Sequence, residues 1–316
     1  MRYHTYGSYM KEKYGQKVYK IPINILVSCP NRDGCVDVNG CIFCGEKGSG
    51  FENLPHTFSV KEQLEKNIEY IKKKYKADKY VVYFQNFTNT YLPITELKKY
   101  AEEACIKDVV ELSFATRPDC ISDEYLTVLS KISQKYSVKI NIELGLQTVN
   151  YRTLDKINRG HSLAEFIDAV LRIKKYKFEV CVHVILSLPW DDEKDVIETA
   201  KILSALDIQH VKIHALYVEK NTELCRMYEK DEIEMIPLED YVNRVVLFLE
   251  YLSPVIVIQR IAGRAPEEDT VFCNWNTSWW KIKDMIEAKL ESLNTFQGAR
   301  CDYLNGKALR KFQLKG

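Results

Sequence analysis

The chain has 316 residues, of which 46% are hydrophobic and 28% are charged, and its formal net charge is +1. This composition is ordinary for a soluble globular protein, and a charge so close to zero excludes any prediction of a partner from the field of the whole molecule. No apolar run reaches the roughly 18 residues that a membrane helix needs, so we expect no membrane association.

The first twenty residues and the cysteine content point to a reducing compartment. Residues 1–20 are polar and tyrosine-rich and contain no signal-peptide core, so we expect a cytoplasmic protein. Ten cysteines in such a compartment indicate metal binding and buried thiols rather than disulfides.

Strand-like and helix-like segments alternate through the first two thirds of the chain. Residues 80–84 form a continuous apolar run typical of a buried parallel strand, and Ser162 with Glu165 has the spacing of a helix capping box. The alternation predicts an α/β fold with a parallel sheet and right-handed crossovers. The expected strands are 21–27, 80–84, 109–115, 138–146, 178–188 and 211–216, and the expected helices are 60–75, 95–105, 122–136, 162–176 and 192–206.

Polar residues follow the predicted strands, where the active site of a parallel α/β protein lies. We therefore expect these residues to meet at one rim of the sheet. The polar segments are 29–44, 85–91, 116–119, 147–148 and 158–161, together with His183 and His214 late in their strands.

Four of the ten cysteines lie within residues 29–44, directly after the first predicted strand. Spacing alone leaves three interpretations open: an iron–sulfur cluster held by three of the thiolates, a structural zinc ion held by four, and a redox pair at Cys41 and Cys44. A zinc knuckle normally has two C-x-x-C halves, and only one is present here.

The sequence motifs around these cysteines resemble the cluster loop of radical S-adenosylmethionine (SAM) enzymes of the YhcC/YtqA-like family. Members read C-P-N-R-D-G and then G-C-x-aromatic-C, as residues 29–34 and 40–44 do here. The resemblance implies a [4Fe–4S] cluster on Cys29, Cys41 and Cys44, with the fourth iron left for SAM, and it gives Cys35 no role. It also implies a partial (β/α)6 TIM-like barrel of the radical SAM type.

Other segments carry the same resemblance and imply the SAM contacts. Residues 84–91 are similar to the F-Q-x-x-T-N-T-Y of the family, and residues 143–147 resemble the E-L-G-[VL]-Q of elongator-type proteins and the G-V-Q of oxygen-independent coproporphyrinogen oxidases. The implied cofactor-binding residues are Phe43, Gln85, Glu143, Gln147, Arg159 and His183. A lone histidine in an apolar strand is, without such a context, more often a core residue.

Some positions depart from the family pattern. The loop after the fifth strand reads S-L-P-W-D-D, with Ser187 and Trp190 where the pattern has glycines, and Gln259 and Arg264 replace a glutamate and an aspartate. If those acids act on the substrate, the substrate of this protein differs from that of its relatives.

The last third of the chain changes in character. We expect a radical SAM core over residues 1–235, with a lead-in over 1–20, and a C-terminal α/β extension over 236–316 that packs on it. The extension should hold a helix over 238–252, a short strand over 255–258 and a helix that ends near 293. We expect its tryptophans, Trp275, Trp279 and Trp280, to pack against the open side of the barrel rather than to stack on a base.

For the substrate, the resemblance to elongator-type enzymes implies a tRNA wobble-uridine side chain, with tRNA as partner and flavodoxin or ferredoxin as electron donor. A small metabolite or a tetrapyrrole-like ligand is the alternative substrate. A metal-binding module without turnover is the alternative from another class, and the altered acids keep it open.

Overall fold

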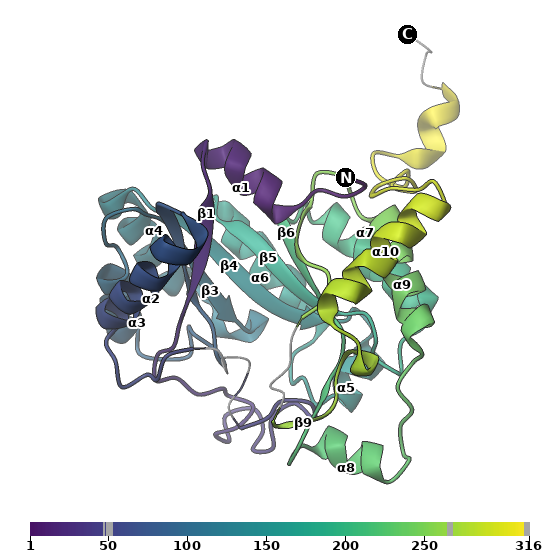
Figure 1. Cartoon of the computed structure of the whole chain (residues 1–316), viewed down its shortest axis with the longest axis horizontal. Coiled ribbons are helices and arrows are strands. Elements are labelled where there is room, and N and C mark those ends of the chain that lie inside the picture. The colour runs from purple at the N-terminus through teal and green to yellow at the C-terminus, as the bar shows by residue number, and fades with distance from the viewer. Residues whose placement is uncertain (47, 49–52, 264–267, 313–316) are drawn as a thin grey trace.

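The computed structural model describes residues 1–46, 48, 53–263 and 268–312. One seven-stranded sheet runs through them in the order β1-β2-β3-β4-β5-β6-β8, and every neighbouring pair is parallel. The sheet curls into a half-barrel with helices on its outer face (Figure 1), which confirms the predicted partial barrel. The strands are Val18–Ile23, Lys79–Phe84, Val109–Thr116, Lys139–Gln147, Glu179–Ile185, His210–His214 and, as β8, Val257–Arg260.

The crossover helices cover the sheet because their apolar stripes face it. Ring stacking between Phe84 of β2 and Phe114 of β3, with centroids 4.7 Å apart, lies in the single large core that sheet and helices share. Ser59 and Ser162 close capping boxes at the starts of α2 and α6, as the spacing at Ser162 predicts. The helices are α2 (Val60–Tyr75), α3 (Ile94–Glu103), α4 (Asp123–Tyr136), α6 (Leu163–Lys175) and α7 (Glu193–Ala205).

The largest differences in strand extent from the prediction are at the ends of the first and fifth strands. The first strand ends at Ile23 rather than at residue 27, because the Gln63 side chain bonds the backbone of Asn24 and takes the place of a neighbouring strand. The fifth strand ends at Ile185 rather than at residue 188, because the chain turns there and the Ser187 hydroxyl accepts the backbone N–H of Leu216.

Helix α1 (Tyr6–Tyr14), which the sequence analysis does not predict, lies at the end of the half-barrel opposite to the loop of residues 29–44 (Figure 1). Lys13 bonds Glu111 and Glu179 near the amino ends of β3 and β5, both at 2.7 Å. Just before α1, the carbonyl of His4 accepts the N–H of Ile258 at 2.8 Å. The lead-in therefore closes the amino end of the barrel and reaches the edge strand β8.

The C-terminal third completes the sheet as well as covering it. Strand β8 pairs with β6 as the seventh strand, while α9 (Leu238–Tyr251) packs against α7 and α10 (Trp279–Ser292) packs against α9. Trp275 packs against Tyr241 and Phe272, which belong to the C-terminal part itself rather than to the open side of the barrel. Trp280 is 55% exposed and stacks on Trp279.

Shorter elements that the sequence analysis does not predict are α5 (Tyr151–Lys156), α8 (Glu223–Glu229) and an antiparallel pair, β7 (Val218–Glu219) with β9 (Thr270–Phe272). In the part of the chain that the structure describes, no helix has the length and apolar character to cross a membrane.

Candidate functional site

A cavity opens at the carboxyl ends of the strands, with an empty volume of about 1120 Å³ including its mouth. It brings together eight of the nine residues that the sequence analysis selects: Cys29, Cys41, Phe43, Cys44, Glu143, Gln147, Arg159 and His183. Gln85 lies outside this lining, and its side-chain amide donates to Asn53 Oδ1 at 3.0 Å. Its neighbours Phe87 and Thr88 line the cavity instead.

The cysteine loop is held in place by the segment that follows α5. Asn31 Nδ2 donates to the carbonyl of Asn158 at 2.6 Å, and Asn158 Nδ2 donates to the carbonyl of Gly40 at 2.8 Å. Gly40 has a φ of 74°, in the left-handed region that favours glycine. Arg32 donates to the carbonyls of Cys44 and Gly45. Two segments far apart in sequence thus fix the backbone that carries the thiols.

The thiols of this loop differ in surroundings. Cys41 is buried, and its Sγ lies 3.6 Å from both Asn31 Nδ2 and Arg159 Nη1. Burial raises the pKa of Cys44 to about 11, and the neighbouring Cys41 adds to the rise. Cys35 is exposed and does not line the cavity. The cavity therefore receives three of the four cysteines, with hydrogen-bond donors beside one of them.

The spacing of the three sulfurs bears on the choice between a cluster and a single ion. Within the described ranges, the one trio of His, Cys, Asp or Glu ligand atoms that lie within 4.8 Å of one another is Glu143, Cys181 and His183. The loop cysteines are thus spaced more widely than the ligands of one tetrahedral zinc ion, which sit about 2.3 Å from the metal. The three loop sulfurs therefore do not all lie within 4.8 Å of one another.

Arg159 is fixed by Gly145 and supports the cysteine loop. Its Nη2 donates to the carbonyl of Gly145 at 2.8 Å, and a side chain at Gly145 would place Cβ 2.7 Å from that same nitrogen. His161 Nε2 reaches the same carbonyl at 3.0 Å, and burial together with Arg159 lowers the pKa of His161 to about 3. The neutral imidazole and the guanidinium therefore share one acceptor without a second buried charge.

Glu143 is the centre of a buried charge network below the cavity. Its carboxylate binds Lys20, Ser113 Oγ at 2.5 Å, Lys212 Nζ at 2.5 Å and His183 Nε2 at 2.8 Å. Burial alone would raise the pKa of Glu143, but Lys20 and Lys212 hold it well below its usual range. Burial lowers the pKa of Lys212 to about 7 and that of His183 to about 4.

The sequence does not reveal three members of this network, Ser113, Lys20 and Lys212. For the two lysines the available signal is alternation along the strand: Lys20 is the one charged residue in VYKIPI, and Lys212 stands between Val211 and Ile213 in HVKIH. Lys20 and Lys212 also bear on whether Glu143, Cys181 and His183 form a metal site. Because Lys20 and Lys212 already bind both carboxylate oxygens, the trio belongs to a charge network rather than to a site for a divalent cation.

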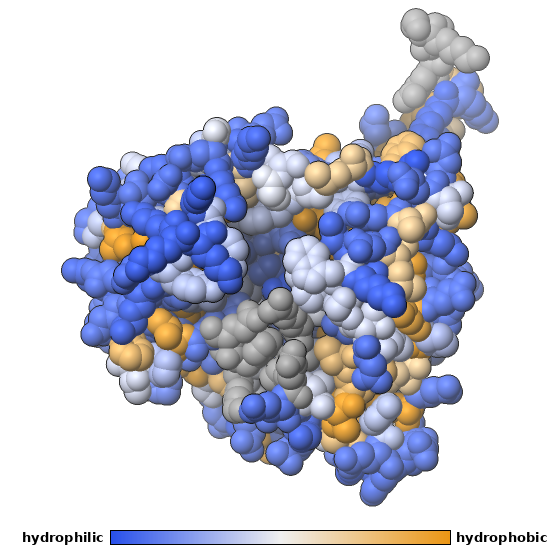
Figure 2. Space-filling model, viewed as in Figure 1, coloured by the Kyte–Doolittle hydropathy of each residue, from blue (hydrophilic) through white to orange (hydrophobic). Residues whose placement is uncertain are grey.

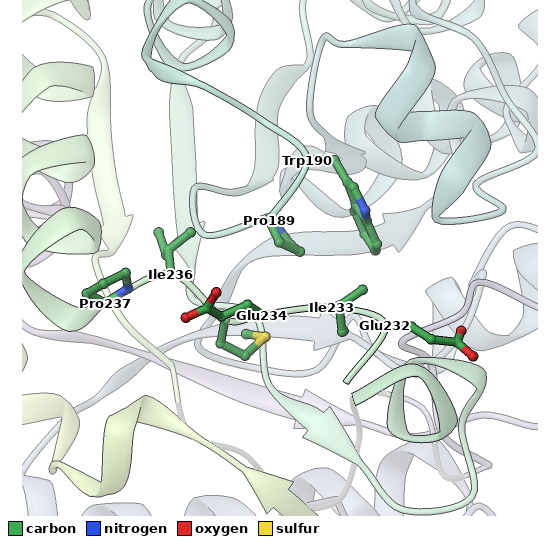
Figure 3. Close-up of a pocket in the computed structure, with 8 residues that line it drawn as sticks. Pro189, Trp190, Glu232, Ile233, Glu234, Ile236 and Pro237 are labelled. Atoms are coloured by element: carbon green, nitrogen blue, oxygen red, sulfur yellow. The ribbon is translucent and has the colours of Figure 1, made fainter. Parts of the chain in front are cut away.

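A second groove lies outside the half-barrel, with an empty volume of about 710 Å³. Figure 3 shows Pro189 and Trp190 on one side of it and residues 232–237 on the other. None of the nine selected residues lines this groove. Trp190, one of the departures from the family pattern, thus faces outward, and Arg264, another of them, lies outside the described residues.

Comparison with known proteins gives matches along nearly the whole chain. The sequence model of the Radical SAM superfamily matches residues 24–203, and that of the Radical_SAM C-terminal domain matches residues 208–292. The chain is 37% identical to the uncharacterized protein YtqA of Bacillus subtilis over 298 residues, which cover 94% of this chain and 92% of YtqA. It is 39% identical to the uncharacterized protein MJ0486 of Methanocaldococcus jannaschii over 299 residues, which cover 93% and 91%.

Two further matches are more distant. The chain is 25% identical to the tRNA uridine(34) acetyltransferase of Methanocaldococcus jannaschii over 162 residues, or 50% of this chain and 28% of that protein. Among solved structures, the archaeal Methanocaldococcus infernus Elp3 is similar with a TM-score of 0.69 and 17% identity, over 93% of this chain and 67% of Elp3. At that identity, the likeness to Elp3 shows a shared fold.

Proposed function

Because the chain belongs to the radical SAM superfamily, we propose that Cys29, Cys41 and Cys44 hold a [4Fe–4S] cluster and that the cavity beside them binds SAM. When bound, the cluster supplies the electron that cleaves SAM to a 5′-deoxyadenosyl radical. The observation that carries the proposal is the convergence of these three thiols, from one short loop, on the cavity that Glu143, Gln147, Arg159 and His183 also line.

The residues present fit such a group. Three thiols, spaced more widely than the ligands of a single ion, leave one iron of a four-iron cluster without a protein ligand. Asn31 and Arg159 beside the Cys41 sulfur would stabilise its thiolate and would shift the potential of a cluster bound there. Loading the site must release the proton that burial holds on the Cys44 thiol.

The chain's own residues would position the cofactor and exclude water. Phe43 covers the cavity wall next to Cys44, and Gln147 offers a neutral amide that can bond a ribose hydroxyl. Arg159 supplies a guanidinium for a carboxylate. Gln85 does not line the cavity, so it would contribute to SAM binding through its position directly after the end of β2. His183, neutral and hydrogen-bonded to Glu143, would present the rest of its ring to the cavity.

For the substrate we propose a tRNA wobble-uridine side chain. The support is the sequence match to a tRNA uridine(34) acetyltransferase over half of this chain and the fold shared with Elp3. Lys72, Lys73 and Lys74 in the last turn of α2 supply local positive charge for a phosphate backbone. A small electron-transfer protein such as flavodoxin or ferredoxin would deliver the reducing electron.

The test uses anaerobic protein reconstituted with iron and sulfide and compares two cysteine variants of one loop. We expect the wild type and Cys35→Ala to bind about four irons per chain and to form 5′-deoxyadenosine with SAM and dithionite. Cys41→Ala should lose both properties. Equal iron content in the two variants, or tight zinc without SAM cleavage, would refute the cluster assignment.

The substrate is tested separately, by incubating the active enzyme with bulk tRNA and analysing the nucleosides by mass spectrometry. We expect a change of mass at a modified uridine, and binding of tRNA that weakens as salt rises. If SAM is cleaved but no tRNA binds at any salt concentration, the radical SAM activity stands and the substrate is a small molecule.

A further inference from the structure

Beside the cavity lining, where β6 pairs with β8, positive charge exceeds negative charge. The charges are those of Lys20, Lys212, Arg260 and Glu143. Burial and the positive charges of Lys20 and Arg260 lower the pKa of Lys212, although the carboxylate of Glu143 opposes this shift. Glu143 has no capacity left for a third cation, because its two oxygens already accept from Lys20, Lys212, Ser113 and His183. One positive charge is therefore left without a carboxylate.

Arg260 is that unmatched charge. It ends β8, its side chain is exposed, and within residues 1–46, 48, 53–263 and 268–312 no ion pair joins it to a carboxylate. Its guanidinium nonetheless lies beside the cavity, because a Cβ at Gly263 would sit 3.4 Å from Arg260 Nη1 and 3.8 Å from Nδ1 of His214. His214 lines the cavity, as do Tyr83 and Tyr217. The positive charge of Arg260 acts to lower the pKa of each of these three side chains.

Two buried nitrogens next to Arg260 lack partners. Gln259 accepts from Lys20 Nζ through its Oε1 at 3.0 Å, while its Nε2 has no hydrogen-bond partner in the described structure. His214 stacks on His183 with ring centroids 5.2 Å apart, and its Nε2 likewise has no partner there. A buried donor left unmatched costs about 1–3 kcal/mol, so such groups point to a ligand or to ordered water.

From these three groups we infer that Gln259, Arg260 and His214 form a subsite for an anionic group of the substrate, a carboxylate or a phosphate. Arg260 supplies the charge and a planar pair of donors, Gln259 Nε2 donates a further hydrogen bond, and His214 donates another in the tautomer that carries its proton on Nε2. The inference rests on the proposed function. It restricts the substrates of the enzyme to those that carry such an anionic group. Arg159 lies elsewhere, against Gly145 and Cys41, so the subsite is separate from the guanidinium proposed for SAM.

The position of the subsite suits a substrate that enters from the side. Strands β1 and β8 are the two edges of the sheet and do not pair with each other, and Figure 2 shows the molecule hollowed between the part that holds α2 and the part that holds α10. The Lys20–Gln259 hydrogen bond links β1 to β8 at that gap.

The test is chemical modification of arginines in the reconstituted holoprotein with phenylglyoxal, followed by peptide mass spectrometry. Acetate and inorganic phosphate are the two probes, each compared with chloride at equal ionic strength. At four times its Kd a probe should slow modification of Arg260 about fivefold, because only a fifth of the sites remain free. Arg152 is exposed on α5, and its guanidinium donates to the neighbouring Tyr151 hydroxyl. It is the matched control and should react at an unchanged rate.

The outcomes separate the sources of the anion. Protection by acetate alone assigns a carboxylate, and protection by phosphate alone assigns a phosphate. Equal rates in acetate, phosphate and chloride would overturn the inference, and so would protection by SAM without protection by either anion. None of these readouts needs turnover, so a failure of SAM cleavage in the wild type would be recognised separately as a failure of the proposed function.

A single isosteric substitution sharpens the result. Gln259→Glu adds a carboxylate next to Arg260 and Lys20, which should compete with the probe and abolish the protection. Protection that persists unchanged in Gln259→Glu would show that the anion binds elsewhere. The wild-type experiment stands without this variant, so its folding is not a condition of the test.

Discussion

The two ends of the half-barrel hold buried charge in different arrangements, although the same strands run through both. At the amino end, Glu111 and Glu179 are matched by Lys13, His210 and two tyrosine hydroxyls, and α1 closes the space. Near the carboxyl end, the single carboxylate of Glu143 is shared between two lysines and a histidine, with a cavity above it. The comparison separates a layer that α1 closes from one that lies beside a cavity. A buried nitrogen without a partner in the described part of the chain occurs in both, His210 Nδ1 at the amino end and His214 Nε2 near the carboxyl end, but only His214 is among the residues that line the cavity.

The largest effect should follow from removing the shared carboxylate. Glu143→Gln leaves Lys20 and Lys212 buried beside a neutral amide, and breaking such a buried pair costs about 3–5 kcal/mol. Urea unfolding of the reconstituted protein measures the loss. Glu111→Gln is the control at the other end, where Lys13 keeps Glu179 as a partner, and a loss at Glu111 as large as that at Glu143 would erase the difference between the two layers.

Removing the cation of the amino-end layer should have a smaller effect. Lys13→Met leaves Glu111 with the Tyr14 hydroxyl at 2.6 Å and Glu179 with His210, so the expected cost is about 1–3 kcal/mol. SAM cleavage should persist because α1 lies at the opposite end from the cysteines. Loss of SAM cleavage in a variant that is still folded at the assay temperature would show that the two ends are coupled.

The smallest effect, counted per pH unit, comes from the titration of Lys212. The pKa of Lys212 is about 7 in the folded chain and near 10.4 when unfolded, so between these values the unfolded chain binds the extra proton. Lys212 should therefore make the free energy of unfolding rise with pH above 7, by up to about 1.4 kcal/mol per unit. Comparing wild type with Lys212→Met at pH 7 and pH 9 isolates this slope, and parallel pH profiles would mean that Lys212 stays charged beside Glu143.

The sequence predicts the parts of the site that are contiguous in the chain. The cysteine loop and the strand carrying Glu143 and Gln147 follow from motifs and from the alternation of strands and helices, and they do line one cavity. The alternation also predicts the parallel sheet, because each apolar strand is followed by a helix with one apolar face.

What the sequence does not predict depends on pairs of residues that are far apart in the chain. Lys20 and Lys212 become interpretable only once β1 and β6 place both against Glu143. Helix α1 is missed because its partners are glutamates from β3 and β5 rather than an apolar stripe of its own. Gln85 follows a motif to the end of β2, but Asn53 engages its amide away from the cavity.

The late position of β8 in the chain has a consequence for synthesis. Strand β6 is made well before Val257–Arg260, so until the ribosome has added α8, α9 and β8, one edge of β6 has no neighbour. At about 5–20 residues per second this interval lasts on the order of several seconds. An unpaired edge strand is a template for pairing with other chains, and the inward-facing charge of Lys212 gives β6 a built-in obstacle to such pairing while it waits for its neighbour.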